Sequence, residues 1–222
     1  MPEGVRLIDI SPHQHPRGSR GPDWQAIRAS GVSGVYLRAR EGKDADEVPG
    51  GYSFEQHRRA ALEAGLLVGA YQYLRARHPG RYQADLLLEQ LGDLGPGELP
   101  PAVDCEELHG RSAVETQACL LAWVDRVHLA IGRDPVVYTG PAFWTATLHG
   151  QTLSELAGCP LWLAAYLSTK PAAPRPWGRV ALWQYTGSGS VPGVAGSCDV
   201  SLWQGDEASL RAWAGGVCRG PF

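Results

Sequence analysis

Several features that would assign this chain to a familiar class are absent from its sequence. No window approaches the roughly 18 consecutive apolar residues of a membrane-spanning helix, and the N-terminus lacks the charged-then-apolar layout of a secretory signal. The 20 Lys and Arg residues are scattered and the formal net charge is −3, so no basic surface for nucleic acid is visible. From these absences we expect no membrane insertion and no nucleic-acid partner.

Cysteine is also scarce, with five residues and no CxxC spacing. The odd count leaves at least one thiol unpaired, and we expect reduced, mostly buried thiols, with a Cys198–Cys218 pair as the alternative. His13 and His15 lack a third ligand, so no metal and no other cofactor is expected. A serine nucleophile would need a Gly-x-Ser-x-Gly elbow, which Gly187-Ser188-Gly189 does not provide.

The chain does contain a regular alternation of apolar runs and helical segments. Gly or Ser positions bound the helices predicted over 24–30, 53–64, 81–91 and 112–131, whereas helices are short over 143–148 and 152–156 and one closes the chain at 206–213. Such alternation predicts a parallel sheet, and eight strands at this length predict closure into a barrel. The strands are expected over 5–11, 34–40, 66–74, 99–107, 135–140, 160–166, 180–185 and 198–203.

The fourth of these runs ends in two carboxylates separated by one residue, Asp104 and Glu106. Side chains two apart on a strand share a face, so their roots would lie roughly 6–7 Å apart. Cys105 would point to the opposite face, away from both acids. A solvated strand end is the plain alternative for this tripeptide, and a pair of proton-handling carboxylates is the functional one.

Other polar and aromatic side chains also fall where predicted strands end. In a parallel barrel the reactive groups gather at the carboxyl ends of the strands, so these residues are expected to converge. They are Asp9, Glu41, Tyr71, Asp104, Glu106, Tyr138, Tyr166, Gln184 and Asp199.

These motifs, taken in order, resemble the glycoside hydrolase family 25 lysozymes, the Chalaropsis-type muramidases. The resemblance spans residues 5 to about 206. It is carried by Ile8-Asp9-Ile10-Ser11, Arg38-Ala39-Arg40-Glu41-Gly42, Gly69-Ala70-Tyr71-Gln72-Tyr73, Val103-Asp104-Cys105-Glu106, Val137-Tyr138-Thr139-Gly140, Leu161-Trp162-Leu163-Ala164-Ala165-Tyr166, Leu182-Trp183-Gln184-Tyr185 and Asp199.

The resemblance implies a modified TIM-like α/β barrel, with five β/α units followed by three strands with little helix. It also implies cleavage of the β-1,4 bond between N-acetylmuramic acid and N-acetylglucosamine in peptidoglycan. Glu106 would be the general acid, and the accompanying carboxylates would be Asp104, Asp9 and Asp199. The residues expected to contact the glycan are Glu41, Tyr71, Gln72, Tyr73, Tyr138, Trp162, Tyr166, Trp183 and Gln184.

The nucleophile is left open between a protein carboxylate and the substrate's own N-acetyl oxygen, and we favour substrate assistance with net retention. The chain departs from the family pattern at Gln72, where His is usual, and at Arg40, where Thr is usual. Arg38 and Arg40 are interpreted either as contacts for peptidoglycan carboxylates or as residues in structural ion pairs. The departures keep a second function in view, a catalytically impaired glycan-binding or structural module on the same barrel.

We expect one catalytic barrel domain over 1–222, with a core at about 5–214 and no separate cell-wall-binding domain. The expected partner is the peptidoglycan glycan strand, met by a monomer that acts alone or within a phage tail or injection machine. No signal peptide is visible, so phage-type release from the cytoplasm, secretion by a non-Sec route and trimming of a leader stay open. In each case the place of action would be the cell wall.

Overall fold

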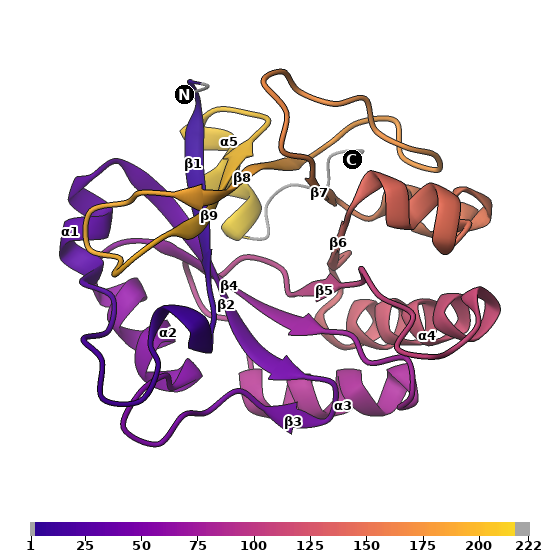
Figure 1. Cartoon of the computed structure of the whole chain (residues 1–222), viewed down its shortest axis with the longest axis horizontal. Helices are drawn as coiled ribbons and strands as arrows, with labels where there is room; N and C mark the ends of the chain where they lie inside the picture. Colours follow the sequence, from indigo (N-terminus) through magenta and orange to yellow (C-terminus); the bar gives the residue numbers. More distant parts are fainter. Residues whose placement is uncertain (1–2, 216–222) are drawn as a thin grey trace.

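Eight strands form a closed barrel in the computed structural model, which describes residues 3–215 (Figure 1). The order around the barrel is β1-β9-β8-β7-β6-β5-β4-β2, and pairing of β1 with β2 closes it. A short ninth strand, β3 (Asp44–Ala45), pairs with the end of β2. The barrel strands are β1 (Val5–Ile10), β2 (Val32–Glu41), β4 (Leu67–Tyr73), β5 (Ala102–Asp104), β6 (Val136–Thr139), β7 (Leu161–Ala164), β8 (Leu182–Gly189) and β9 (Cys198–Trp203).

The closed barrel is confirmed, but an all-parallel sheet is the wrong expectation for β9. This strand runs antiparallel to both of its neighbours, β8 and β1, whereas the other neighbouring barrel strands are parallel. The cause is the connection from β8, which is a loop over 190–197 with no crossover helix. A strand joined to its neighbour without a crossover returns in the opposite direction.

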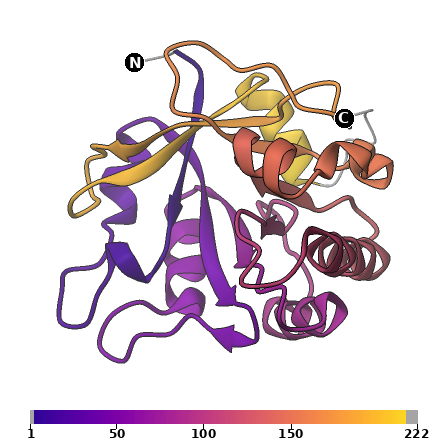
Figure 2. The same ribbon diagram turned by 45° about the vertical axis from the view of Figure 1, so that its right-hand side comes forward.

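The helices lie outside the barrel, with α3 and α4 side by side in both views (Figures 1 and 2). Asp23 and Ser112 cap α1 and α4 by accepting hydrogen bonds from backbone N–H groups, as the sequence pattern indicates. After β6 the connection consists of π and 3₁₀ turns within 143–158 rather than an α-helix. The helices are α1 (Trp24–Ala29), α2 (Phe54–Glu63), α3 (Gly80–Leu91), α4 (Ala113–Ile131) and α5 (Glu207–Ala214).

Strand alternation divides the apolar residues between two cores. The inner core fills the barrel and includes Tyr36 and Trp162, while Trp213 of α5 joins it at one end. Gly69 makes room inside, because a Cβ there would lie 2.2 Å from the Tyr36 ring. The outer core lies between the barrel and the helices and includes Trp123 of α4.

The cysteines belong to the outer core, as their scarcity and spacing suggest. Cys105, Cys119, Cys159 and Cys198 are buried free thiols. Cys218, the partner in the alternative pairing, lies outside the described residues.

Candidate active site

A cavity of about 290 Å³ opens at the carboxyl ends of the parallel strands. Except for Glu41, the strand-end residues predicted to converge do so here, from strands far apart in sequence. Four carboxylates, the rings of four tyrosines and one tryptophan, and one guanidinium share the lining. The described lining residues are Asp9, Ser11, His13, Gln14, Arg38, Tyr71, Tyr73, Asp104, Glu106, Tyr138, Trp162, Tyr166, Gln184 and Asp199.

The Gln184 amide organises the wall formed by β1, β6, β7 and β8. Its Nε2 donates to Asp9 Oδ2 at 3.0 Å. Its Oε1 accepts from the hydroxyls of Tyr138 and Tyr166, at 3.1 Å and 3.2 Å. Because one amide serves three partners, the carboxylate and both tyrosine rings are held in fixed orientations.

Asp9 and Asp199 face each other across the antiparallel pair of β1 and β9. The pKa of Asp9 is raised well above its usual value by burial and by the charge of Asp199. Burial also raises the pKa of Asp199, while its hydrogen bond with Asp9 opposes the rise. Like charges this close do not both ionise readily, so the environment disfavours the doubly ionised form of the pair.

Asp104 and Glu106 line the same cavity, as their spacing predicts, although β5 itself ends at Asp104. Asp104 is buried, and its Oδ1 has no hydrogen-bond partner among the described residues. Burial and the charge of Glu106 raise the pKa of Asp104 well above its usual value. Burial and the charges of Asp199 and Glu107 raise the pKa of Glu106. Simultaneous ionisation of all four acids in the cavity is therefore disfavoured.

Arg38 is the guanidinium in the cavity wall. Its Nε pairs with Asp46, and its Nη2 lies 3.8 Å from Glu41 Oε2. Both interpretations of Arg38 from the sequence therefore fit its position, since it lines the cavity and forms ion pairs. Arg40 is different, because it donates to Gln90 Oε1 and the Lys43 carbonyl rather than lining the cavity.

Two residues expected to contact the glycan lie on the outside of the barrel. Gln72 follows Tyr71 in β4 and faces the other way, donating to the Gly42 carbonyl and accepting from Trp123 Nε1. Trp183 precedes Gln184 in β8 and donates to the Ala165 carbonyl within the outer core. Strand alternation forces both orientations, and it contradicts the expectation of substrate contact.

Glu41 also lies outside the cavity lining. Its carboxylate accepts from Arg75, and its pKa is lowered by that hydrogen bond and charge despite partial burial. We assign it to an ion-pair cluster beside the cavity rather than to the lining.

Three lining residues were not predicted, namely Ser11, His13 and Gln14. They belong to the 3₁₀ turn Pro12–Gln14 that follows β1, where Ser11 and Gln14 form a reciprocal capping box. The signal available in the sequence was the place of this segment directly after Asp9 at a strand end.

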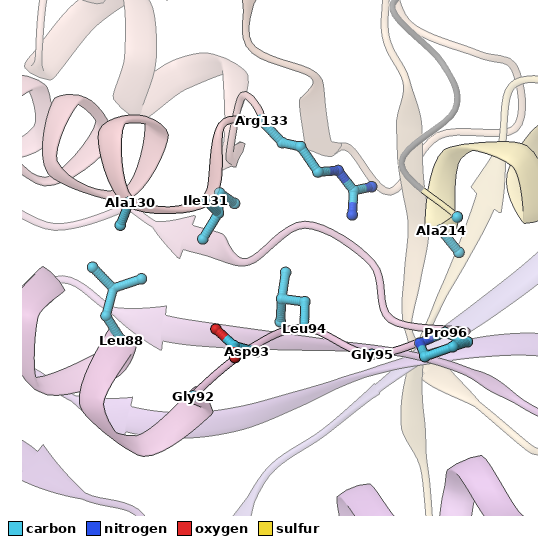
Figure 3. Close-up of a pocket in the computed structure, with 11 residues that line it drawn as sticks. Leu88, Gly92, Asp93, Leu94, Gly95, Pro96, Ala130, Ile131, Arg133 and Ala214 are labelled. Atoms are coloured by element: carbon cyan, nitrogen blue, oxygen red, sulfur yellow. The ribbon is translucent and has the colours of Figure 1, made fainter.

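A larger hollow, of about 760 Å³, lies where β5 and β6 begin, at the opposite end of the barrel (Figure 3). Its described lining is mainly apolar and includes Leu94 and Ile131. Asp93 is the single carboxylate among the described lining residues, and the Arg133 guanidinium donates to the Trp213 carbonyl. The smaller cavity is therefore the candidate active site, because it alone of the two gathers several acids.

Comparison with known proteins identifies the family of the chain. The sequence model described as glycosyl hydrolases family 25 matches residues 8–194, which contain Asp9, Asp104 and Glu106. The chain belongs to glycosyl hydrolases family 25. The resemblance inferred from the motifs is thus confirmed, and the chain is a glycoside hydrolase.

Relatives of this glycosyl hydrolase include a lysozyme and a muramidase. Lysozyme M1 from Streptomyces globisporus is 29% identical over 220 residues, covering 95% of this chain and 71% of its own length. An N,O-diacetylmuramidase from Chalaropsis sp is 30% identical over 215 residues, covering 88% and 96%. The crystal structure of the bacterial lysozyme from Streptomyces coelicolor superposes with a TM-score of 0.86 at 27% identity, covering 97% and 99%. The modified TIM-like barrel of the family is confirmed.

The sequence contains no apolar run long enough to form a membrane-spanning helix. Within residues 3–215, no helix combines the length and the apolar composition that crossing a membrane requires.

Proposed function

We propose that this family 25 hydrolase is a muramidase that cleaves the β-1,4 bond between N-acetylmuramic acid and N-acetylglucosamine in peptidoglycan. One observation carries the proposal: Glu106 and Asp104 share a cavity with Asp9 and Asp199, and the pKa of each carboxyl is raised. The lysozymes and muramidases among its relatives support this choice of substrate. We assign the activity to a single barrel domain.

Glu106 is the general acid in this proposal. A group that protonates a leaving oxygen must carry its proton near neutral pH, and a raised pKa meets that requirement. Among the described residues, no cation pairs with the Glu106 carboxyl to oppose the rise. The proton moves from Glu106 to the glycosidic oxygen as the bond to C1 breaks.

Asp104 is the orienting carboxylate. Its unpartnered Oδ1 is the buried acceptor available for the N-acetyl N–H of the substrate. Held this way, the N-acetyl carbonyl oxygen attacks C1 as Glu106 donates its proton, and water later opens the cyclic intermediate while Glu106 takes a proton back. This sequence predicts net retention at C1. Asp9 and Asp199 stabilise the positive charge that develops on the sugar ring.

Aromatic side chains form the sugar-facing wall. Tyr71, Tyr73, Tyr138 and Trp162 line the cavity, and Tyr166 stands at its mouth with an exposed fraction of 63%. Pyranose faces bind by apolar contact with such rings, while the hydroxyls and the Gln184 amide supply hydrogen bonds. The site therefore favours a neutral amino-sugar chain.

The alternative function, an impaired glycan-binding or structural module, rested on the departures at Gln72 and Arg40. Both side chains point away from the cavity and are satisfied by protein partners. Neither departure removes a group from the lining, so hydrolysis is the better-supported function.

The test is release of reducing ends from purified peptidoglycan by the wild-type chain and by Glu106→Gln. We expect the substitution to lower kcat by about 10²- to 10⁴-fold, because it removes the general acid. The matched control is Glu107→Gln, the same change one residue along, which should keep most of the activity. An inactive wild type, or an equally active Glu106→Gln, would contradict the proposal. Proton NMR of the first-formed anomer tests retention, and inversion would exclude substrate assistance.

The cell wall is the place where we propose that this activity acts. The substrate is confined to the wall, and relatives include an autolytic lysozyme from Clostridium acetobutylicum. We propose a monomeric enzyme, because the described cavity is completed by residues of one chain.

A further inference from the structure

The loop between β5 and α4 carries Glu106 and has an unusual backbone. His109 in this loop has φ at +52°, in the left-handed region that residues other than glycine rarely adopt. Such a conformation costs of order 1 kcal/mol and persists where surrounding contacts hold it. The contacts around His109 therefore indicate what fixes the loop.

Arg75, which follows β4, supplies the main contact. Its Nη1 donates to His109 Nδ1 at 2.7 Å, and its Nη2 pairs with Glu41 at the end of β2. The guanidinium carbon lies 4.7 Å from the centroid of the Tyr73 ring, which lines the cavity. One guanidinium thus connects β2, the end of β4 and the loop after β5.

Glu107 is oriented by the same group of residues. Tyr73 donates its hydroxyl proton to Glu107 Oε2 at 3.2 Å, and His109 Nδ1 lies 3.5 Å from that oxygen. Since Arg75 donates to His109 Nδ1, this nitrogen carries a lone pair and the imidazole is neutral. Burial and the Arg75 charge lower the pKa of His109, in agreement with a neutral ring.

The position of Glu107 matters for the neighbouring acid. Burial and the Asp199 charge raise the pKa of Glu106 most, and the Glu107 charge raises it further. Tyr73 is the described group that donates to the Glu107 carboxylate, and Arg75 lies over the Tyr73 ring. The other titratable groups that interact with Glu106 from across the cavity are Asp9, Tyr73, Asp104, Tyr138, Tyr166 and Asp199.

We propose that Arg75 and His109 are positioning residues that hold the Glu106 loop over the cavity, and that Arg75 also fixes the place of the Glu107 carboxylate through Tyr73. The inference rests on the proposed function, in which Glu106 donates the proton. Neither residue lines the cavity, and both act through the loop. Arg75 is suited to the role because its planar fork binds two partners at fixed angles while stacking on a ring, which lysine cannot do.

The first experiment compares Arg75→Ala with Arg77→Ala. Arg77 is exposed and forms no hydrogen bond or ion pair with the described residues, so it controls for loss of a nearby positive charge. We expect Arg75→Ala to lower kcat about 10- to 100-fold with less than about a twofold change in KM, since misplacement of a reacting group acts on turnover. Arg77→Ala should match the wild type. Thermal unfolding of each variant measures the folded fraction.

The pH profile separates positioning from a merely structural role. The limb of kcat/KM that falls with rising pH reports loss of the Glu106 proton. Releasing Glu107 weakens the like-charge effect, so Arg75→Ala should move this limb to lower pH. Glu107→Gln should move it in the same direction with little loss of kcat. Arg77→Ala should leave it in place.

A double-mutant cycle tests whether the two residues act together. Because Arg75 and His109 meet in one hydrogen bond, the loss of kcat in Arg75→Ala/His109→Ala should be close to that in Arg75→Ala alone. Arg75→Lys should recover only part of the loss. Additive effects, or full rescue by lysine, would overturn the inference.

The remaining outcomes are also decisive. If Arg75→Ala keeps the wild-type kcat and the alkaline limb of kcat/KM does not move, the positioning role is overturned and the proposed function stays intact. The same holds if the loss of kcat in Arg75→Ala equals the fraction of unfolded protein. If the wild type hydrolyses no peptidoglycan, the proposed function fails. The inference then depends on ¹³C NMR titration of the Glu106 carboxyl, assigned with Glu106→Gln. A midpoint that Arg75→Ala leaves unmoved would overturn it.

Discussion

The two ends of the barrel interior have opposite character, although the same strands build both. On β1, Leu7 lies in the apolar inner core and Asp9 lies in the cavity two residues later. On β9, which runs the other way, Trp203 is in the inner core and Asp199 is in the cavity. The apolar end stabilises the barrel, whereas the cavity end keeps acids together at a cost in stability.

The contrast between the two ends separates the residues that stabilise the fold from those proposed to act in catalysis. The inner core gains stability from packed apolar groups, including the stacked rings of Trp203 and Trp213. The cavity gathers four carboxylates, and burial raises the pKa of each. Substitutions at one end should therefore change stability and leave catalysis intact, and substitutions at the other should do the reverse.

The largest expected effect is that of Asp104→Asn. We predict a fall in kcat of about 10³-fold, or about 4 kcal/mol of transition-state stabilisation, because the orienting carboxylate is lost. The free energy of unfolding should rise by about 1 kcal/mol at neutral pH, because a buried carboxylate with an unpartnered oxygen is removed. Steady-state kinetics and urea denaturation measure the two effects. The control is Asp125→Asn at an exposed position of α4, and lowered stability in Asp104→Asn would break the comparison.

The next effect is at the opposite end, in Trp213→Ala. Trp213 is buried and stacks on Trp203 with ring centroids 4.8 Å apart. Truncating it leaves a large void, so we predict a loss of about 3 kcal/mol in the free energy of unfolding. The kcat per folded molecule should stay within about a factor of two of the wild-type value. Trp213→Phe should lose less stability, and a selective loss of kcat would show that the two ends are coupled.

The smallest effect sharpens the comparison through pH. His57 Nε2 is hydrogen-bonded to His15 Nδ1 at 2.9 Å, and burial together with His15 lowers the pKa of His57 to about 4. The unfolded chain takes up this proton near pH 6.5. Acidification from 6.5 toward 4 therefore favours unfolding, by about 1 to 2 kcal/mol at pH 5 after allowance for solvent screening.

The cavity carboxyls act with the opposite sign. Since the pKa of Asp104 is raised, its contribution is favourable at low pH and is lost as pH rises through the folded-state value. Denaturation of the wild type and of His57→Gln at pH 7.5 and pH 5 separates the two groups, because the variant lacks only the histidine contribution. An identical pH dependence in both proteins would contradict the role given to His57.

Much of the fold was predictable from local patterns. The helices begin and end close to their predicted limits because Ser112 and Asp23 are N-cap residues and Gly132 adopts the left-handed conformation after α4. Asp104 and Glu106 reach one cavity because they are two residues apart at a strand end. In each case the physical cause acts over a few residues, so the sequence displays it directly.

Other features depend on the direction of a strand or on its neighbours. Gln72 and Trp183 lie next to cavity residues in sequence, yet alternation turns them outward. Motif membership does not distinguish the two faces of a strand, so both were misassigned. The reversed direction of β9 and the approach of His13 to the cavity also follow from how the barrel closes.

The sequence by itself determined the barrel class, the family and the central acids, because periodicity, capping and motif order are local properties of the chain. Only the tertiary structure decided which side chains face the cavity, that Gln184 orients Asp9 and two tyrosines, and that Arg75 reaches His109. These contacts join residues 18 to 175 positions apart. Barrel closure brings them together, and no local pattern encodes that proximity.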